Sequence, residues 1–323
     1  MQRVTLTLLA VWLLSGCAQL IERQMASYKG SRHLNMDVGQ YTQSWCSQAG
    51  CVNVTDWSDV KKMNGTEPLT KLTASLRVAI DQQLYEEDVV LEFEPLSDNS
   101  PIIVMFPGYG MRAEALGLKA LYFRSRGFRP LVVASPTEQK PFNFGLSSIE
   151  VIADYLTDHY STHDVYAYGF SMGSLAVAEL SQRFPVQGAI VVAPMLDFDD
   201  AASQLIDLYR RNTVFARAIP QQSFQQGLER LALNASVERK KLFWPYAVTL
   251  LPSNTLVVGS YYDSISNFSL VSAEVARHHR HFYLAGINLP SFEHPAMAMP
   301  LEPAIAPIDA WFQLQPIGSL QAE

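Results

Sequence analysis

The sequence has few positive charges and no large cluster of them. It contains 24 Lys and Arg against 31 Asp and Glu, so its formal net charge at pH 7 is −7. Basic residues adjoin only in short local runs such as Arg210-Arg211 and Lys240-Lys241. Because a nucleic-acid groove needs a concentrated basic surface, this pattern argues against nucleic acid as a partner. We expect a small or neutral molecule instead.

The N-terminus lacks an apolar run long enough to span a membrane. Met1-Gln2-Arg3 precedes an apolar stretch over residues 4–14, and the small residues Ser15-Gly16 then lead to Cys17. A basic start, a short apolar stretch and small residues are typical of a secretory signal. The ending over 14–17 resembles the lipobox of bacterial lipoproteins. This resemblance implies that residues 1–16 are a cleaved signal peptide and that Cys17 is lipidated.

The same resemblance predicts a location in the cell envelope. The residue after Cys17 is Ala18 rather than Asp, which in lipoproteins of Gram-negative bacteria implies sorting to the outer membrane. Membrane attachment would then depend on the acyl chains carried by Cys17. An ordinary signal peptide followed by an incidental cysteine is the alternative.

Cysteine is scarce, with three residues in the chain. Cys46 and Cys51 are separated by four residues, and in an oxidising exported compartment this pair favours a disulfide that closes a small loop. Metal binding is the alternative, but two cysteines and the distant His33 are too few ligands at the wrong spacing. The sequence also has no dinucleotide-binding fingerprint. We therefore expect neither a metal nor a cofactor.

Composition divides the chain near residue 71. Residues 17–71 are polar and without a sustained hydrophobic period, which predicts a tether and a small N-terminal extension containing the Cys46–Cys51 loop. From residue 72 onward, alternating runs at 76–80 and 89–94 predict an antiparallel pair. Apolar, strand-like runs follow at 102–106, 129–134, 165–170, 188–193, 255–259 and 281–286. Helical patterns lie among them at 114–125, 147–157, 175–180, 270–277 and 304–312. This order predicts an α/β domain over 72–323, with a mainly parallel sheet covered by helices on both faces.

One interval, at about 197–253, is too long for a simple connection between strand and helix. Its helical patterning predicts an inserted lid over the carboxyl edge of the sheet, where such folds bind ligands. A lid would bring its aromatic and apolar side chains toward an acyl pocket; the alternative is that they form the insertion's own core. The candidates are Phe215, Phe224, Leu242, Phe243, Trp244 and Tyr246.

A Gly-x-Ser-x-Gly motif lies between the run at 165–170 and the helix at 175–180. It places Ser171 on a strand-to-helix turn, which is the context of a nucleophile elbow. A serine on so sharp a turn brings backbone segments close together, and Gly169 and Gly173 have no Cβ to clash. The turn also sets Ser171 at a helix N-terminus, where N–H groups face a developing oxyanion.

A serine nucleophile needs a base and a group that orients the base. Of the seven histidines, His294 alone follows the carboxyl end of a predicted core strand, where Ser171 also lies. Two carboxylates compete for the orienting role. Asp263 follows the run at 255–259 and gives the chain order Ser, Asp, His, so we favour it. Asp197, which follows the run at 188–193, is the alternative.

An oxyanion hole needs two backbone N–H groups. One is expected from Met172, the residue after the nucleophile. The other is expected from the glycine-containing loop after the run at 102–106, where Tyr109 is the first candidate and Gly110 the second.

Over residues 72–323 the chain resembles the α/β-hydrolase superfamily. The resemblance rests on the Ser171 motif, the Pro107-Gly108-Tyr109-Gly110 loop, Asp263 and His294. It implies Ser171 as nucleophile, His294 as base and Asp263 as its partner, with Tyr109 and Met172 as oxyanion donors. Many members have His-Gly where this chain has Pro107-Gly108.

Three functions are compatible with these residues. The first is a lipid-anchored serine hydrolase that cleaves carboxylic esters or thioesters of a small-molecule substrate through an acyl-enzyme on Ser171. The second is an acyltransferase that passes the acyl group to an acceptor other than water. The third is a non-catalytic envelope lipoprotein that uses the fold as a scaffold, although a scaffold has no need of an intact Ser, Asp and His.

Overall fold

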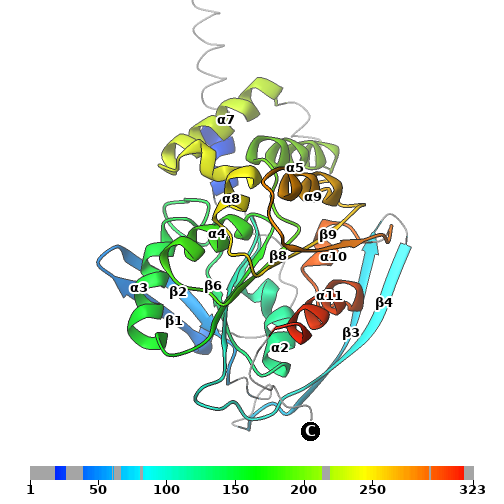
Figure 1. Cartoon of the computed structure of the whole chain (residues 1–323). Helices are drawn as coiled ribbons and strands as arrows, with labels where there is room; N and C mark the ends of the chain where they lie inside the picture. Colours follow the sequence, from blue (N-terminus) through cyan, green and yellow to red (C-terminus); the bar gives the residue numbers. More distant parts are fainter. Residues whose placement is uncertain are drawn as a thin grey trace, which may run out of the picture.

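A sheet of eight strands runs through the computed structural model of the chain (Figure 1). The structure describes residues 19–26, 39–59, 61, 67–80, 83–212, 219–290 and 292–315. The expected signal peptide and Cys17 lie outside these residues. The strands are β1 (Thr42–Ser47), β2 (Gly50–Asp56), β5 (Ile102–Phe106), β6 (Arg129–Val133), β7 (Val165–Phe170), β8 (Gly188–Val192), β9 (Thr255–Ser260) and β10 (Tyr283–Ile287).

The spatial order of the strands is β1-β2-β6-β5-β7-β8-β9-β10. The six strands from β6 to β10 in this order are parallel to their neighbours, whereas β1 and β2 are antiparallel. The mainly parallel sheet predicted from the continuous apolar runs is therefore confirmed. Parallel strands with both faces covered need apolar side chains on both sides, and β5, β7 and β8 are buried along their whole length.

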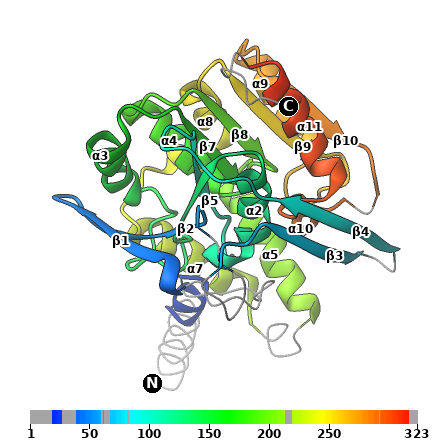
Figure 2. The ribbon, with the colours of Figure 1, turned by 90° about the horizontal axis from the view of Figure 1, so that it is seen from below.

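Helices cover both faces of the sheet (Figures 1 and 2). On one face lie α3 (Ser148–Tyr160), α4 (Gly173–Arg183), α8 (Trp244–Leu250) and α9 (Phe268–Arg277). On the other lie α2 (Gly117–Ser125), which continues the 3₁₀ turn η2 (Ala113–Leu116), and α11 (Glu302–Gln313). The sheet separates two hydrophobic cores. The first core lies on the face covered by α3, α4, α8 and α9, and the second core lies on the face covered by α2 and α11. Successive residues of β5 alternate between them: Val104 packs in the first core and Met105 in the second.

The N-terminal extension predicted beside the tether contributes two strands to the main sheet. A short 3₁₀ turn, η1 (Gly39–Tyr41), leads into β1 and β2, which extend the main sheet because β2 pairs with β6. Val52 and Val54 of β2 are buried, and Trp45 of β1 stacks on Tyr155 of α3 with ring centroids 3.9 Å apart. Two buried apolar side chains at alternate positions help to hold β2 on the domain, but they are too few to give this polar stretch a recognisable hydrophobic period.

The antiparallel pair expected near 76–94 forms a sheet of its own, made of β3 (Lys71–Ile80) and β4 (Gln83–Glu92). Leu76, Val89 and Leu91 are buried in the core that also contains α2 and α11. Both carboxylate oxygens of Glu87 accept the N–H of Glu302 at the start of α11, at 3.0 and 2.9 Å. The hairpin therefore packs on one face of the molecule without joining the main sheet.

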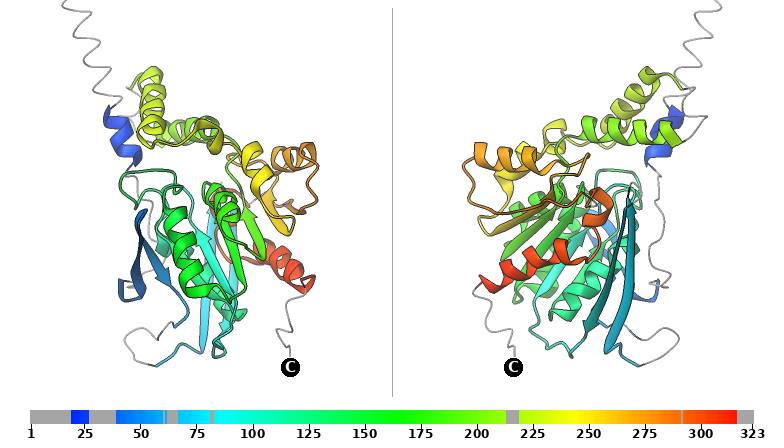
Figure 3. Two further views of the ribbon diagram at one scale, coloured as in Figure 1. Left: turned by 60° about the vertical axis from the view of Figure 1, so that its left-hand side comes forward. Right: turned by 90° about the vertical axis from the view of Figure 1, so that its right-hand side faces the viewer.

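The insertion after β8 contains α5 (Phe198–Asn212), α7 (Gln221–Asn234) and the 3₁₀ turn η3 (Arg239–Leu242). Figure 3 shows α5 and α7 as a layer across one edge of the sheet. The expected range of 197–253 is wider than this layer, because α8 lies against α4 and α9 and covers the sheet. Within the described residues, no helix is both long and apolar enough to cross a membrane.

Candidate active site

Ser171 lies on the turn between β7 and α4 and has a backbone φ of 54°. This left-handed conformation is unusual for a residue other than glycine. The flanking residues must be glycines because there is no room for a side chain at either position. A Cβ on Gly169 would lie 2.6 Å from the carbonyl oxygen of Gly173. A Cβ on Gly173 would overlap the carbonyl oxygen of Phe106 at the end of β5. The close backbone approach predicted from the two glycines is present.

Three side chains from distant parts of the chain form one hydrogen-bonded series. The Nε2 atom of His294 lies 2.9 Å from the hydroxyl oxygen of Ser171, and its Nδ1 atom lies 2.7 Å from Oδ2 of Asp263. A carboxylate accepts hydrogen bonds, so the Nδ1 position carries the proton in this arrangement. Nε2 is then an acceptor for the hydroxyl of Ser171. This geometry suits transfer of the serine proton to the imidazole.

Asp263 is fully buried, and backbone groups hold its carboxylate in place. Its Oδ1 atom accepts hydrogen bonds from the N–H groups of Ile265 and Ser266, at 2.9 and 2.8 Å. Oδ2 is thereby aimed at His294.

The alternative carboxylate, Asp197, makes different contacts. Its Oδ1 atom accepts the N–H groups of Asp199 and Asp200 at the start of α5, at 2.7 and 3.2 Å. Asp197 therefore caps a helix of the insertion. The structure places Asp263, and not Asp197, beside the imidazole.

The loop that carries His294 is fixed by aromatic packing. His294 is the first residue of α10 (His294–Met297), and Phe292 just before it is fully buried. The ring of Phe292 meets that of Tyr85 from the β3–β4 hairpin edge to face, with centroids 5.5 Å apart. The ring of Phe170 lies 5.0 Å from the imidazole. The hairpin thus supports the loop that holds the histidine.

The loop after β5 lies directly against Ser171. A Cβ on Gly108 would be 3.1 Å from the Cβ of Ser171 and 3.0 Å from the ring of Phe170, so a glycine permits this contact. Tyr109 follows Gly108, and Met172 stands at the N-terminus of α4, where the helix provides no acceptor for the first N–H groups. Both residues therefore lie on segments next to the serine.

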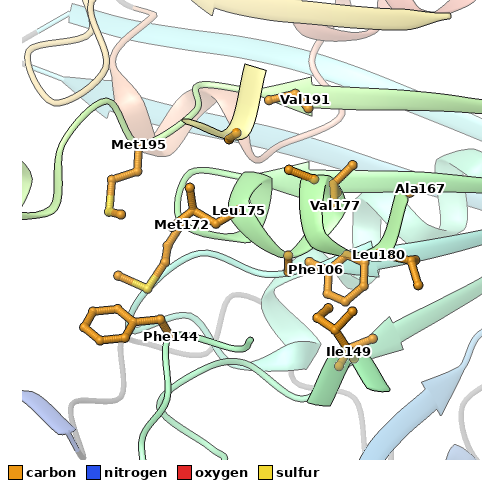
Figure 4. Packing of buried hydrophobic residues seen from close by; sticks show 14 of the residues in the cluster. Phe106, Phe144, Ile149, Ala167, Met172, Leu175, Val177, Leu180, Val191 and Met195 are labelled. Atoms are coloured by element: carbon orange, nitrogen blue, oxygen red, sulfur yellow. The ribbon is translucent and has the colours of Figure 1, made fainter. Parts of the chain in front are cut away.

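A cavity of about 350 Å³ opens beside Ser171 and His294. Its remaining walls are mostly apolar, and methionines are prominent among them. Figure 4 shows two of these, Met172 and Met195, at one end of the first core together with Phe144. The lining residues are Met25, Arg77, Tyr109, Met111, Ala115, Phe170, Met172, Met195, Phe198, Ala201, Ala202, Ile265, Pro295, Ala298 and Met299.

The described members of the six insertion residues named above do not line this cavity, which agrees with the alternative that they are core residues. Phe224, Leu242 and Trp244 are buried in the first core, and Phe243 and Tyr246 are half-buried elsewhere. Phe215 lies outside the described residues. The insertion contributes Phe198, Ala201 and Ala202 of α5 instead. Phe198 is the one large side chain among these three, and the other two are alanines.

Solved structures of similar shape exist at low sequence identity. An esterase of Pyrococcus furiosus aligns with a TM-score of 0.50 and 10% identity, over 75% of this chain and 88% of its own. A protein of unknown function from Staphylococcus aureus aligns with a TM-score of 0.50 and 14% identity, over 74% of this chain and 98% of its own. Together with the strand order and the turn at Ser171, these alignments decide the architecture. The chain has the α/β-hydrolase fold.

A third structure of this fold, an α/β serine hydrolase without a lid from Xanthomonas campestris, aligns over 86% of this chain and 96% of its own. Its TM-score is 0.49 and its identity is 11%. No protein-family model and no curated protein sequence matched the chain. The α/β-hydrolase fold therefore rests on the structural comparison.

Met25 and Arg77 are among the cavity residues that sequence reasoning did not predict. Met25 belongs to a helix at 19–26, in the segment expected to be a tether, and Arg77 belongs to β3. The Nε atom of Arg77 lies 2.7 Å from Oε1 of Glu86, so the cation is paired where it meets the cavity. Neither residue carries a local signal, because Met25 and Arg77 lie 146 and 94 residues before Ser171 and come near it only through tertiary contacts.

The described residues contain no group of three or more His, Cys, Asp or Glu side chains arranged to hold a metal ion.

Proposed function

We propose that this protein is a serine hydrolase that cleaves carboxylic esters or thioesters. The observation that carries the proposal is the series Ser171–His294–Asp263, with contacts of 2.9 and 2.7 Å, whose first two members line an apolar cavity. A serine hydroxyl is a weak nucleophile at neutral pH, and an adjacent oriented imidazole is what activates it.

In the proposed reaction the Ser171 oxygen attacks the substrate carbonyl carbon while its proton passes to Nε2 of His294. The buried carboxylate of Asp263 stabilises the imidazolium that forms. The N–H groups of Met172 and Tyr109 would receive the negative charge on the carbonyl oxygen. His294 then protonates the leaving alcohol or thiol, and water releases the acyl group from Ser171 by the same steps in reverse.

Because the cavity walls are mostly apolar, we expect the cavity to hold the acyl chain of the substrate rather than a charged part of it. Burial of each methylene in such a site contributes about 0.8 kcal/mol. The methionines have unbranched, flexible side chains that adapt to an inserted chain. We therefore expect esters with an aliphatic acyl chain to be hydrolysed faster than acetate esters.

Labelling with a fluorophosphonate probe tests the proposal. The purified wild type should be labelled and should hydrolyse p-nitrophenyl esters, and Ser171→Ala should do neither. Ser174→Ala is a matched control, because Ser174 is a buried serine directly after the motif, and its hydroxyl donates to the backbone carbonyl of Ser171 rather than to His294. A folded wild type without labelling would contradict the proposal. Analysis of the products formed in the presence of an added alcohol distinguishes the two activities. A new ester indicates acyl transfer, and a free acid indicates hydrolysis.

We further propose that Cys17 is lipidated and anchors the protein to the outer membrane. The described part of the N-terminal segment starts at residue 19, two residues after Cys17, so an anchor on Cys17 would lie within about 7 Å of it. Cys17→Ser should free the protein from membrane fractions and abolish incorporation of labelled palmitate. Cys46→Ser, which changes a cysteine far from the lipobox, should leave both unchanged. Membrane association of the Cys17→Ser protein would overturn the anchor.

A further inference from the structure

The helix at 19–26 lies beside the active site rather than apart from it. Figure 3 shows it, in dark blue, next to α7 above the edge of the sheet. Met25 lines the cavity that contains Ser171 and His294.

Three separate contacts fix the helix. Ile21 is buried, with 6% of its surface exposed, and belongs to the first core. The carboxylate oxygen Oε1 of Glu22 accepts a hydrogen bond from Nδ2 of Asn234 at the end of α7. The backbone carbonyl of Met25 accepts a hydrogen bond of 2.7 Å from the hydroxyl of Tyr109.

The contact with Tyr109 connects the helix to the reaction centre. Tyr109 lines the same cavity, and its neighbour Gly108 packs against Ser171. The contact therefore fixes the position of Met25 relative to Ser171, although the two are 146 residues apart along the chain. Its side chain extends the series of cavity methionines formed by Met111, Met172, Met195 and Met299.

We propose that the helix at 19–26 is a wall of the acyl-binding cavity and that Met25 sets the length of the acyl chain the enzyme accepts. The inference rests on the proposed hydrolase function. A shorter side chain at this position lengthens the space available to an acyl chain, and a bulky one shortens it. Each methylene that gains or loses an apolar contact changes kcat/KM by about fourfold.

The test compares kcat/KM for p-nitrophenyl esters of two to twelve acyl carbons. Met25→Ala should raise the ratio of kcat/KM for the longest over the shortest ester by about tenfold, which corresponds to between one and two methylenes. Met25→Trp should lower it by a similar factor, and the conservative Met25→Leu should keep the wild-type ratio.

Gln24→Ala is the matched control, because Gln24 is exposed on the same helix. It should leave the ratio unchanged. The inference is overturned if Met25→Ala and Met25→Trp keep the wild-type ratio while both are labelled by the fluorophosphonate. It is also overturned if Gln24→Ala shifts the ratio as much as they do. A wild type without labelling would instead contradict the hydrolase proposal itself, so the two failures are distinguishable.

Discussion

The Nδ1 atom of His294 lies 2.7 Å from the carboxylate of Asp263, a side chain with no exposed surface. A buried carboxylate is stable when hydrogen bonds satisfy its oxygens. Here the imidazole serves one oxygen and two backbone N–H groups serve the other. The pair is thus rigid on the carboxylate side, and the imidazole ring is aligned toward Ser171.

Replacing Asp263 and Asp197 one at a time tests which of the two carboxylates orients His294. Asp263→Asn should lower kcat by about 10³–10⁴-fold, because an amide does not stabilise the imidazolium and favours the wrong tautomer. Asp197→Asn should retain activity within about twofold, since asparagine is also a good helix cap. Steady-state kinetics of both variants, with folding checked by circular dichroism, gives the answer. Equal losses would argue against the distinct contacts of the two residues.

The glycine at position 173 is expected to tolerate no side chain. Gly173→Ala should lower the free energy of unfolding by about 2–3 kcal/mol, because its Cβ would overlap the carbonyl of Phe106 and force the turn apart. Fluorophosphonate labelling should fall with it, since Ser171 is on the same turn. Urea titration measures the first effect. Ser181→Ala in the same helix should change neither quantity, and a Gly173→Ala protein as stable as the wild type would contradict the steric argument.

A buried lysine in α2 predicts a pH-dependent stability. Lys119 is 1% exposed, and no described residue gives its Nζ atom a hydrogen-bond partner. Burial lowers the pKa of Lys119 to about 7, and Asp309 opposes this shift. The unfolded chain therefore binds more protons than the native state between pH 7 and 10.5, so stability rises with pH over this range. The cost of burying the charge is fully present below pH 7.

Lys119→Met should accordingly raise the free energy of unfolding at pH 7 by about 1–3 kcal/mol. The difference between variant and wild type should shrink as the pH rises from 7 toward 10. Urea denaturation at several pH values measures it. Lys240→Met, at an exposed lysine, should show no such trend. A difference that stays constant with pH would show that Lys119 titrates normally in the folded protein.

The cysteine pair of the β1–β2 hairpin is expected to be oxidised when the protein is produced in an oxidising compartment. Cys46 and Cys51 are opposite each other in the strand register, and their sulfur atoms are paired in the structure. The loop that they close is short, so replacing both by serine should cost only about 1–2 kcal/mol. Thiol titration of the unfolded protein should find neither cysteine free. Two reactive thiols there would show that the pair is reduced.

The sequence alone determined the core of the fold. Six continuous apolar runs predicted the six parallel strands. The reason is that a strand buried on both faces must be apolar throughout, as in β5, β7 and β8; β10, at the edge, is apolar although largely exposed. The glycines around Ser171 predicted its sharp turn, because only residues without a Cβ allow the backbones to approach. The position of His294 after a predicted strand was also informative, because the carboxyl ends of parallel strands lie at the same edge of the sheet, where Ser171 is.

Only the tertiary structure decided which segments close the cavity. Asp263 and Asp197 both follow core strands, and their different partners depend on loop geometry that no local pattern encodes. The helix at 19–26 and the strands β1 and β2 are polar in sequence, yet a few apolar residues dock each of them onto the domain. Met25 reaches the site through a contact with Tyr109 across 84 residues. Such a contact stabilises the folded chain only after the intervening segments have packed, so it leaves no periodic trace in the sequence.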